Sequence, residues 1–293
     1  MNKTVKKSLS LILSIMLCIS LITVANAEEI EVGKDLVVSE YDTIVEYRAM
    51  DVEELQEEGL TAEEIEYVQS TAIEDELLFR KTRSTEELRD YYGYSEDEIE
   101  LLMEYDGERI ESEPELRALT GTLTIYTPDV LYADPDGIGL RVEWEWDQKP
   151  VYTLTDALAV YWVGTYGRDS GNLRIDIDAS SHDVTYTGIT TTTFDRGFVQ
   201  EDLLYGIVGE FKMMYGTYDW ASSGEATLYW DTVDGSADMT SVDFKIMYGH
   251  STVAWGPSFS WPASVGVSAN FGTDEADVRT GYVDISDGEW EEN

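Results

Sequence analysis

The stretch "GLRVEWEW", residues 139–146, decides the fold class because its apolar and charged residues alternate. In an extended chain, successive side chains point to opposite faces. The alternation therefore puts three apolar residues on one face and three charged residues on the other: Val142, Trp144 and Trp146 against Arg141, Glu143 and Glu145. A period of two is typical of a half-buried strand. We predict a strand here, with both tryptophans facing a core.

Strand-like segments recur from Gly121 towards the C-terminus. They are "GTLTIYT" (121–127), "ALAVYWVG" (157–164), "LRIDID" (173–178), "VTYTGITTTT" (184–193), "GEATLYWD" (224–231), "SVDFKIMYG" (241–249) and "SVGVSANF" (264–271). Asp136-Gly137 and Asp234-Gly235 are typical of hairpin turns. About nine to eleven strands with no helical pattern between them predict an all-β antiparallel sandwich or jelly-roll-like domain over residues 120–293.

The preceding part of the chain has a helical pattern and none of the eight tryptophans. It contains a repeat, in which "LQEEGLTAEEIE" (55–66) returns as "LRDYYGYSEDEIE" (88–100). Gly59 and Gly93 each fit the position that ends a helix, because glycine adopts a positive φ without strain. We predict an acidic helical unit over residues 48–119 with two helix–turn–helix corners, which makes the whole chain α+β.

Four capping boxes mark the helix starts of this unit: Asp51 with Glu54, Thr61 with Glu64, Ser84 with Glu87, and Ser95 with Glu98. Apolar spacing predicts one long helix after Thr61 and another after Ser95, which Asp106-Gly107 ends. Two copies are too few for a tetratricopeptide array. We therefore assign the corners a structural role. Residues 28–47, before the unit, are predicted to be extended.

The N-terminus has the pattern of a secretory signal peptide. Three lysines precede an apolar run from Leu9 to Val24, which is short for a membrane span. Ala25-Asn26-Ala27 then fits the small-x-small rule for cleavage. We predict that residues 1–27 are removed, with Ala25 and Ala27 recognised by signal peptidase, and that the mature protein is secreted.

Cysteine use and charge exclude several kinds of function. Cys18 is the single cysteine and leaves with the signal peptide, so disulfides, Cys-ligated zinc and thiol catalysis are not expected. The chain has 19 Lys and Arg against 60 Asp and Glu, a net charge of −41. Nucleic acids and anionic membranes bind clustered basic residues, so neither is an expected partner. We expect no membrane insertion of the mature chain. The charge favours solubility or a cationic partner.

Catalytic motifs are scarce. His182 and His250 are the only histidines, and neither HExxH nor GxSxG occurs. Ser251 follows His250 directly, and neighbours on a strand point to opposite faces, which argues against a catalytic pair. We predict polar structural roles for both histidines, no catalytic residues and no cofactor.

Four weaker hypotheses concern the β domain. Paired carboxylates among Glu143, Glu145, Glu210 and Glu225 could support glycoside hydrolysis. Trp144 and Trp146 could stack on a sugar if they faced outward. "DPDGIGLRVEWE" (134–145) has the length and several ligands of a calcium loop, although a tight turn at Asp136-Gly137 explains it more simply. The Thr-rich "VTYTGITTTTF" (184–194) suits a solvated strand as well as a pore-forming hairpin.

These features predict an exported, acidic, non-catalytic protein that acts by surface interaction outside the cell, with a glycan or a protein as partner. The alternative is a secreted carbohydrate-active enzyme, a glycoside hydrolase, or a carbohydrate-binding protein that uses the β domain.

Overall fold

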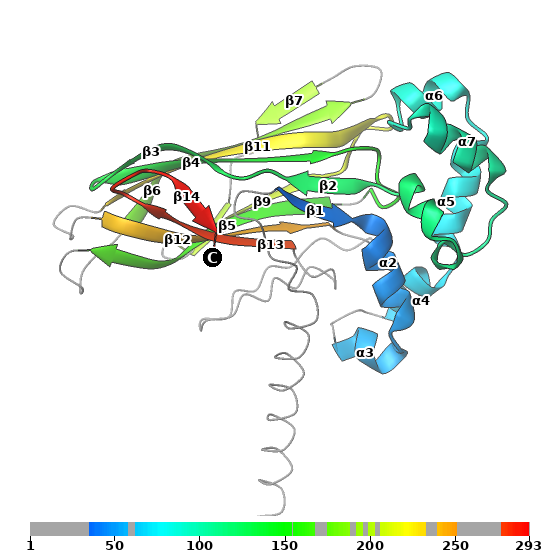
Figure 1. Ribbon diagram of the computed structural model, residues 1–293, viewed down its shortest axis with the longest axis horizontal. Helices are drawn as coiled ribbons and strands as arrows, with labels where there is room; N and C mark the ends of the chain where they lie inside the picture. The colour runs from blue at the N-terminus through cyan, green and yellow to red at the C-terminus, as the bar shows by residue number, and fades with distance from the viewer. Residues whose placement is uncertain are drawn as a thin grey trace, which may run out of the picture. The chain divides into compact units, whose positions relative to one another are not determined.

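The computed structural model describes residues 35–57, 62–153, 155–167, 175–187, 192–195, 199–202, 206–232, 239–250 and 277–292. Asp35–Asn293 form one compact unit. One short strand comes first in this unit, helices follow, and the remaining strands complete two antiparallel sheets, so the chain is a mixed α+β protein with a β-sandwich-like region (Figure 1). The predicted signal peptide, with Ala25 and Ala27, lies outside the described residues.

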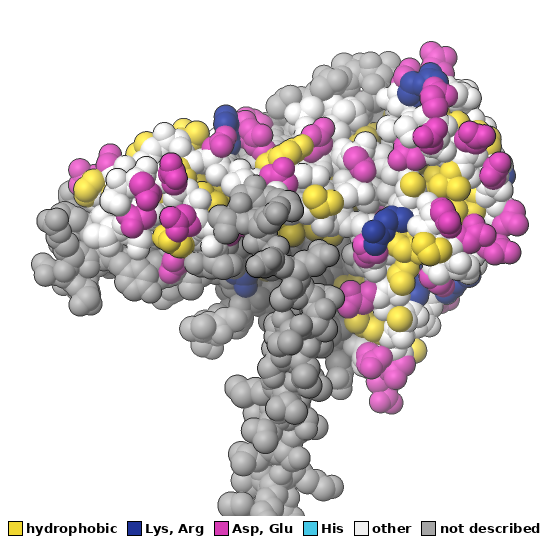
Figure 2. Space-filling model, in the orientation of Figure 1, with side chains coloured by type: hydrophobic (Ala, Val, Ile, Leu, Met, Phe, Trp, Pro, Cys, Tyr) yellow, Lys and Arg dark blue, Asp and Glu magenta, His cyan; other side chains and the backbone are white. Residues whose placement is uncertain are grey.

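The helices gather at one end of the sheets (Figure 1). They are α2 (Glu40–Ala49), α3 (Val52–Glu57), α4 (Ala62–Gln69), α5 (Ala72–Lys81), α6 (Thr85–Asp90), α7 (Glu96–Glu104) and the 3₁₀ helices η1 (Ile110–Ser112) and η2 (Pro114–Leu119). Acidic side chains outnumber Lys and Arg over this part of the surface (Figure 2).

The prediction of an extended segment over residues 28–47 is wrong from Glu40 onward, where α2 begins. Tyr41, Ile44 and Tyr47 recur at helical spacing and are all buried. Burial of this one face favours the helix.

The single long helix predicted after Thr61 is also wrong, because α4 and α5 are separate helices. The break lies at Ser70, whose hydroxyl donates to the Tyr67 carbonyl at 2.6 Å and accepts from the Ala72 N–H at 3.2 Å. A serine side chain that bonds to nearby backbone in this way competes with the helical hydrogen bonds.

The second predicted corner is confirmed. Gly93 has a φ of +84° between α6 and α7, and Ser95 with Glu98 forms a complete capping box. Asp51 and Glu54 exchange the same pair of bonds, and Ser84 accepts from the Glu87 N–H. Gly107, at φ +97°, follows the end of α7 as expected. Gly59, Thr61 and the Glu64 side chain lie outside the described residues.

The first sheet has the strand order β1-β2-β4-β11-β6-β7, with β3 paired to β4 and β10 to β11. Its strands are β1 (Leu36–Ser39), β2 (Thr122–Ile125), β3 (Asp129–Asp134), β4 (Gly137–Trp146), β6 (Ile175–Thr187), β7 (Thr192–Asp195), β10 (Met214–Tyr215) and β11 (Asp219–Thr232). The second sheet has the order β14-β13-β12-β5-β9-β8. Its strands are β5 (Thr155–Gly167), β8 (Val199–Asp202), β9 (Gly206–Lys212), β12 (Met239–Gly249), β13 (Asp277–Asp284) and β14 (Trp290–Glu292).

The inward faces of the two sheets share one apolar core. Val142, Trp144 and Trp146 of β4 are buried in it together with Val160 of β5 and Ile246 of β12. The prediction that the apolar face of "GLRVEWEW" packs inward is therefore confirmed, and sugar stacking on these two tryptophans is excluded because they are 1% and 3% exposed.

The two predicted hairpin turns have different outcomes. Asp136-Gly137 joins β3 to β4, with Asp134 opposite Gly137. Asp234-Gly235 lies outside the described residues, and the strands on either side of it, β11 and β12, belong to different sheets. These two strands therefore do not form the expected hairpin.

Buried polar contacts join the helices to the strands. Arg80 of α5 donates to the carbonyls of Lys149 and Pro150 at 2.9 and 2.8 Å. Trp220 of β11 donates from its indole nitrogen to the Tyr91 carbonyl at 2.7 Å. Independent folding of residues 120–293 stays a prediction.

Candidate functional site

The outward face of β4, β11 and β6 contains a surface depression of about 410 Å³, which we call the acidic pocket. The described residues that line it are Tyr126, Glu143, Trp144, Glu145, Asp183, Thr185, Ser223, Gly224 and Glu225. Four of them are carboxylates, and none is a lysine or an arginine. The pocket is therefore suited to a positively charged group.

Strand register brings three of these carboxylates into one row. Glu225 of β11 lies opposite Glu143 of β4 on one side and opposite Asp183 of β6 on the other. Directly opposed side chains on one sheet face have Cβ atoms about 4.5–5.5 Å apart, and like charges at that distance destabilise the sheet. Arg141, two residues before Glu143, lies 3.3 Å from that carboxylate and also pairs with Asp129.

Gly224 allows the floor of the pocket to form. A Cβ atom at this position would lie 2.6 Å from the indole ring of Trp144. Any larger residue would push against that ring, so glycine lets the tryptophan edge approach the pocket from below. Beside it, the Tyr126 hydroxyl donates to Glu145 at 2.8 Å. The site thus combines carboxylates with the Tyr126 ring, above a buried tryptophan.

The structure brings together three of the four carboxylates that the sequence suggested for glycoside hydrolysis. Glu143, Glu145 and Glu225 meet at the pocket, but Glu210 lies on β9 in the other sheet. Sequence reasoning missed Asp183, which joins the row because β6 pairs with β11. No local pattern marks it, since the pairing of these strands depends on the tertiary fold.

The residues of the proposed calcium loop are spread along a hairpin. Asp134 accepts from the N–H groups of Asp136 and Gly137 at 2.8 and 2.9 Å, so its carboxylate holds the turn. Glu145 lies near the far end of β4, about 25 Å away at the usual rise per residue. One ion cannot bind both. Over the described part of the chain, no three His, Cys, Asp or Glu side chains are grouped to hold a metal ion.

His182 is a core residue. It lies on β6, is 0% exposed, and its Nε2 accepts from the Trp144 indole at 3.1 Å. Burial lowers the pKa of His182 to about 3, so the ring is neutral at ordinary pH. This environment agrees with a structural role.

His250 lies in a second, buried group of titratable residues, which we call the buried triad: Glu40, Asp156 and His250. Its Nδ1 lies 2.9 Å from one Asp156 oxygen, and its Nε2 lies 3.5 Å from a Glu40 oxygen. Ser251 lies outside the described residues. Sequence reasoning treated His250 as an ordinary polar residue and did not find its partners, which lie far away in the chain.

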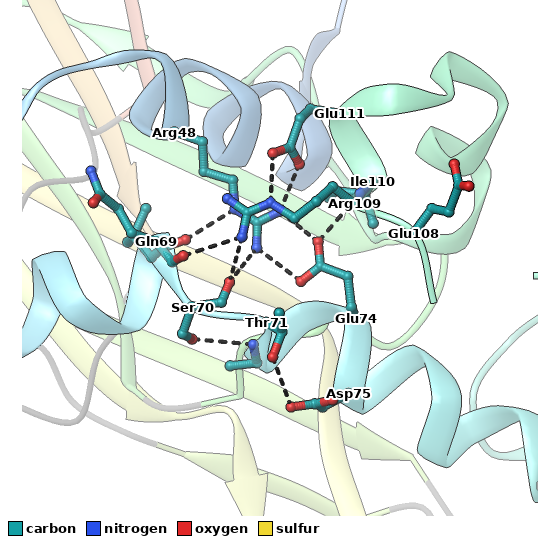
Figure 3. Close-up of polar contacts among 12 residues, drawn as sticks. Arg48, Gln69, Ser70, Thr71, Glu74, Asp75, Glu108, Arg109, Ile110 and Glu111 are labelled. Carbon is teal, nitrogen blue, oxygen red and sulfur yellow. Dashed lines mark hydrogen bonds and ion pairs between the residues drawn. The ribbon is translucent and has the colours of Figure 1, made fainter. Parts of the chain in front are cut away.

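A third charged network organises the helices (Figure 3). Arg48 of α2 donates to Glu74 at 2.6 Å, to Glu111 at 2.7 Å and to the carbonyls of Val68 and Ser70. Burial alone would raise the pKa of Glu74, but the bond from Arg48 helps to lower it. Every partner is a neighbouring helix or its connection, so this network is structural.

Comparisons with known proteins give no family. No family model matches the chain, and no curated protein matches it. Among solved structures it resembles the collagen-binding domain of a Staphylococcus aureus adhesin, at 11% identity over 42% of this chain and 83% of that chain, with a TM-score of 0.28. It also resembles a pore-forming protein, at 8% identity over 59% and 82%, with a TM-score of 0.24.

A third such structure is AvmM, which catalyses macrocyclization in alchivemycin A biosynthesis, at 10% identity over 53% of this chain and 86% of that chain, with a TM-score of 0.25. These scores are too low to support an argument about fold or function. Of the helices that the structure describes, none is long and apolar enough to cross a bilayer.

Proposed function

We propose that this protein is exported and acts outside the cell without catalysis, by binding a positively charged partner at the acidic pocket. The observation that carries the proposal is the row of Glu143, Glu225 and Asp183 across three paired strands. Such a row costs stability. A lysine or arginine side chain, or an amino sugar, would relieve the repulsion and gain charge-assisted hydrogen bonds.

Partner binding is tested with residues 28–293 on protein and glycan arrays, followed by affinity measurements on the hits. The triple variant Glu143→Gln/Asp183→Asn/Glu225→Gln should weaken binding by about tenfold or more, since each charge-assisted bond contributes about 1.5–3 kcal/mol. Binding should also weaken as salt rises, because exposed charges are screened over about 8 Å at physiological ionic strength.

The matched control changes three exposed acidic residues on the helical part, Glu86→Gln/Glu100→Gln/Glu108→Gln, and so alters net charge equally. This control should keep full affinity. Equal loss in both variants would mean that overall acidity attracts the partner and would contradict the assignment to the pocket.

Export is tested by the mass of the secreted protein, which should begin at Glu28 if cleavage follows Ala27. A secreted product that retains Cys18 would contradict the predicted signal peptide.

The alternative function is glycoside hydrolysis, which is favoured by one observation: Glu143, Glu145 and Glu225 share a pocket with Tyr126. Glycosidases use two carboxylates on either side of the bond that is cleaved. A panel of glycoside substrates distinguishes the two functions. Turnover that is abolished by Glu225→Gln, with substrate affinity retained, would establish the enzyme and refute the non-catalytic proposal.

A further inference from the structure

The buried triad joins three distant parts of the chain. His250, directly after β12, lies between Asp156 of β5 and Glu40, the first residue of α2. Its Nδ1 is 2.9 and 3.0 Å from the two Asp156 oxygens, and its Nε2 is 3.5 Å from Glu40. The three side chains are 11%, 0% and 1% exposed. Since both ring nitrogens face carboxylates, the geometry fits the doubly protonated imidazolium.

Glu40 also binds the backbone of the β region. Its carboxylate accepts from the N–H groups of Gly121, Val151 and Tyr152 at 3.1, 2.9 and 2.8 Å. The Glu40 N–H in turn donates to the Gly121 carbonyl at 3.0 Å. The first turn of α2 is therefore held to the connections before β2 and between β4 and β5 by one carboxylate and one backbone hydrogen bond, and the charge of that carboxylate is balanced in part by His250.

Each element packed around His250 contributes to the environment of the ring. From β12, the Tyr248 hydroxyl donates to Asp156 at 2.7 Å. From β4, the Trp146 ring lies 4.8 Å from the imidazole, and from the β4–β5 connection the Tyr152 ring lies 6.4 Å away. The charged groups facing the ring are thus Asp156 and Glu40, and the charge of Glu40 also reaches three groups further out: Lys149, Tyr67 and Tyr94.

We propose that the buried triad is a pH-dependent interlock, which holds the first turn of α2 on the β region while His250 is charged and loosens this junction when His250 loses its proton. Losing that proton would leave two buried carboxylates without a cation, and an uncompensated buried charge is strongly destabilising. Protonation of Glu40 in acid would loosen the same junction by weakening its bonds to Gly121, Val151 and Tyr152.

The pH range follows from the direction of each shift. Burial alone would lower the pKa of His250, but Asp156 and Glu40 raise it well above 6.5. A raised folded pKa means that the contribution of His250 is complete below pH 6.5 and is lost as pH rises through the folded value. Burial alone would raise the pKa of Glu40, but His250 and the backbone N–H groups lower it. The contribution of Glu40 is complete above pH 4.5 and is lost as pH falls.

The titration of a neighbouring lysine, Lys149, sets the highest pH at which a change in stability can be assigned to His250. Burial lowers the pKa of Lys149 to about 8. Its folded pKa is therefore below its unfolded value, so between these two values it makes stability rise with pH and opposes His250. The window from pH 6.5 to 8 thus reports on His250.

The test is hydrogen exchange with mass spectrometry on peptides from residues 36–49, with rates corrected for the intrinsic effect of pH. In the native chain, protection of these peptides should fall by up to about tenfold for each pH unit between 6.5 and 8, the change expected for one linked proton. His250→Gln should remove this dependence. His182→Gln, the control, changes a buried histidine outside the triad and should keep it.

Two outcomes would overturn the proposal. One is native protection that does not change with pH, and the other is a His250→Gln variant with the native slope. If His250→Gln does not fold, Asp156→Asn decides, because asparagine keeps one acceptor oxygen but removes the charge that contributes most to raising the pKa of His250. A native slope in Asp156→Asn would refute the interlock, and a reduced slope would support it.

Discussion

The buried charges of this protein are arranged differently from the carboxylate row of the acidic pocket. In the interior, Arg48, Arg80 and Glu40 each have several oppositely charged or polar backbone partners. On the outward face of β4, β11 and β6, carboxylates instead lie opposite other carboxylates. Burial requires pairing because desolvation is expensive, whereas water and salt screen exposed repulsion. The buried groups therefore hold the fold together, whereas the outward-facing row does not stabilise it and is the basis of the binding proposed above.

The largest effect should come from Arg80, which is 0% exposed. Arg80→Met would remove the donor for the Tyr94 hydroxyl and for the carbonyls of Lys149 and Pro150. We expect the free energy of unfolding in urea to fall by about 3–5 kcal/mol. Arg83→Met, the control, breaks a partly exposed pair with Glu87 and should cost about 0.5 kcal/mol. Similar losses in both variants would show that the buried contacts of Arg80 stabilise the fold no more than the partly exposed pair of Arg83 does.

The next effect concerns acid stability. Burial lowers the pKa of His182 to about 3, below its value of about 6.5 in the unfolded chain. Its contribution is therefore complete above pH 6.5 and is lost as pH falls towards 3, at about 1.4 kcal/mol per pH unit. Between pH 6.5 and 5 the native protein should lose about 2 kcal/mol more than His182→Gln does. Parallel pH profiles of the two proteins in urea unfolding would contradict a neutral, buried His182.

Much of the fold could be predicted from local patterns. The alternation in "GLRVEWEW" correctly placed Trp144 and Trp146 in the core, because a strand with one buried face repeats every two residues. The corner at Gly93 was equally local, since glycine and a capping box mark the end and the start of helices. The start of α2 was missed, although Tyr41, Ile44 and Tyr47 recur at helical spacing and form its buried face.

The candidate site could be predicted only in part. The outward direction of Glu143 and Glu145 follows from alternation, but Asp183 joins them through strand pairing that no local pattern shows. The buried triad could not be predicted for the same reason, because His250 and Asp156 are 94 residues apart in the chain. Their contact exists only once β5 and β12 pair in the second sheet, and Glu40 joins them only when α2 packs there, so a lone histidine gave no indication of the triad.

A smaller effect tests the corner at Gly93. A Cβ atom there would lie 3.1 Å from the Asp147 carbonyl oxygen and would also need a φ of +84°. Gly216, in the turn between β10 and β11, has a φ of +67° but no neighbour within 4 Å. We expect Gly93→Ala to cost somewhat more than 1 kcal/mol of unfolding free energy and Gly216→Ala about 1 kcal/mol or less. Equal costs would mean that backbone strain alone, and not the contact with the β region, sets the effect at Gly93.

The smallest effect should have the opposite sign. Glu225 stands at the centre of the carboxylate row, between Glu143 and Asp183. Glu225→Gln would remove both repulsive pairs while keeping the shape of the side chain. We expect the free energy of unfolding to rise by about 0.2–1 kcal/mol at low salt, and this gain to shrink as salt is added.

A control for this stabilisation is Glu289→Gln, which neutralises an exposed carboxylate in the turn before β14. It removes the same unit of charge but lies outside the acidic pocket. If Glu289→Gln stabilised the chain as much as Glu225→Gln, the gain would come from lower net charge alone. A gain confined to Glu225→Gln, together with loss of partner binding, would show that this face keeps a destabilising row of charges because the row binds the partner.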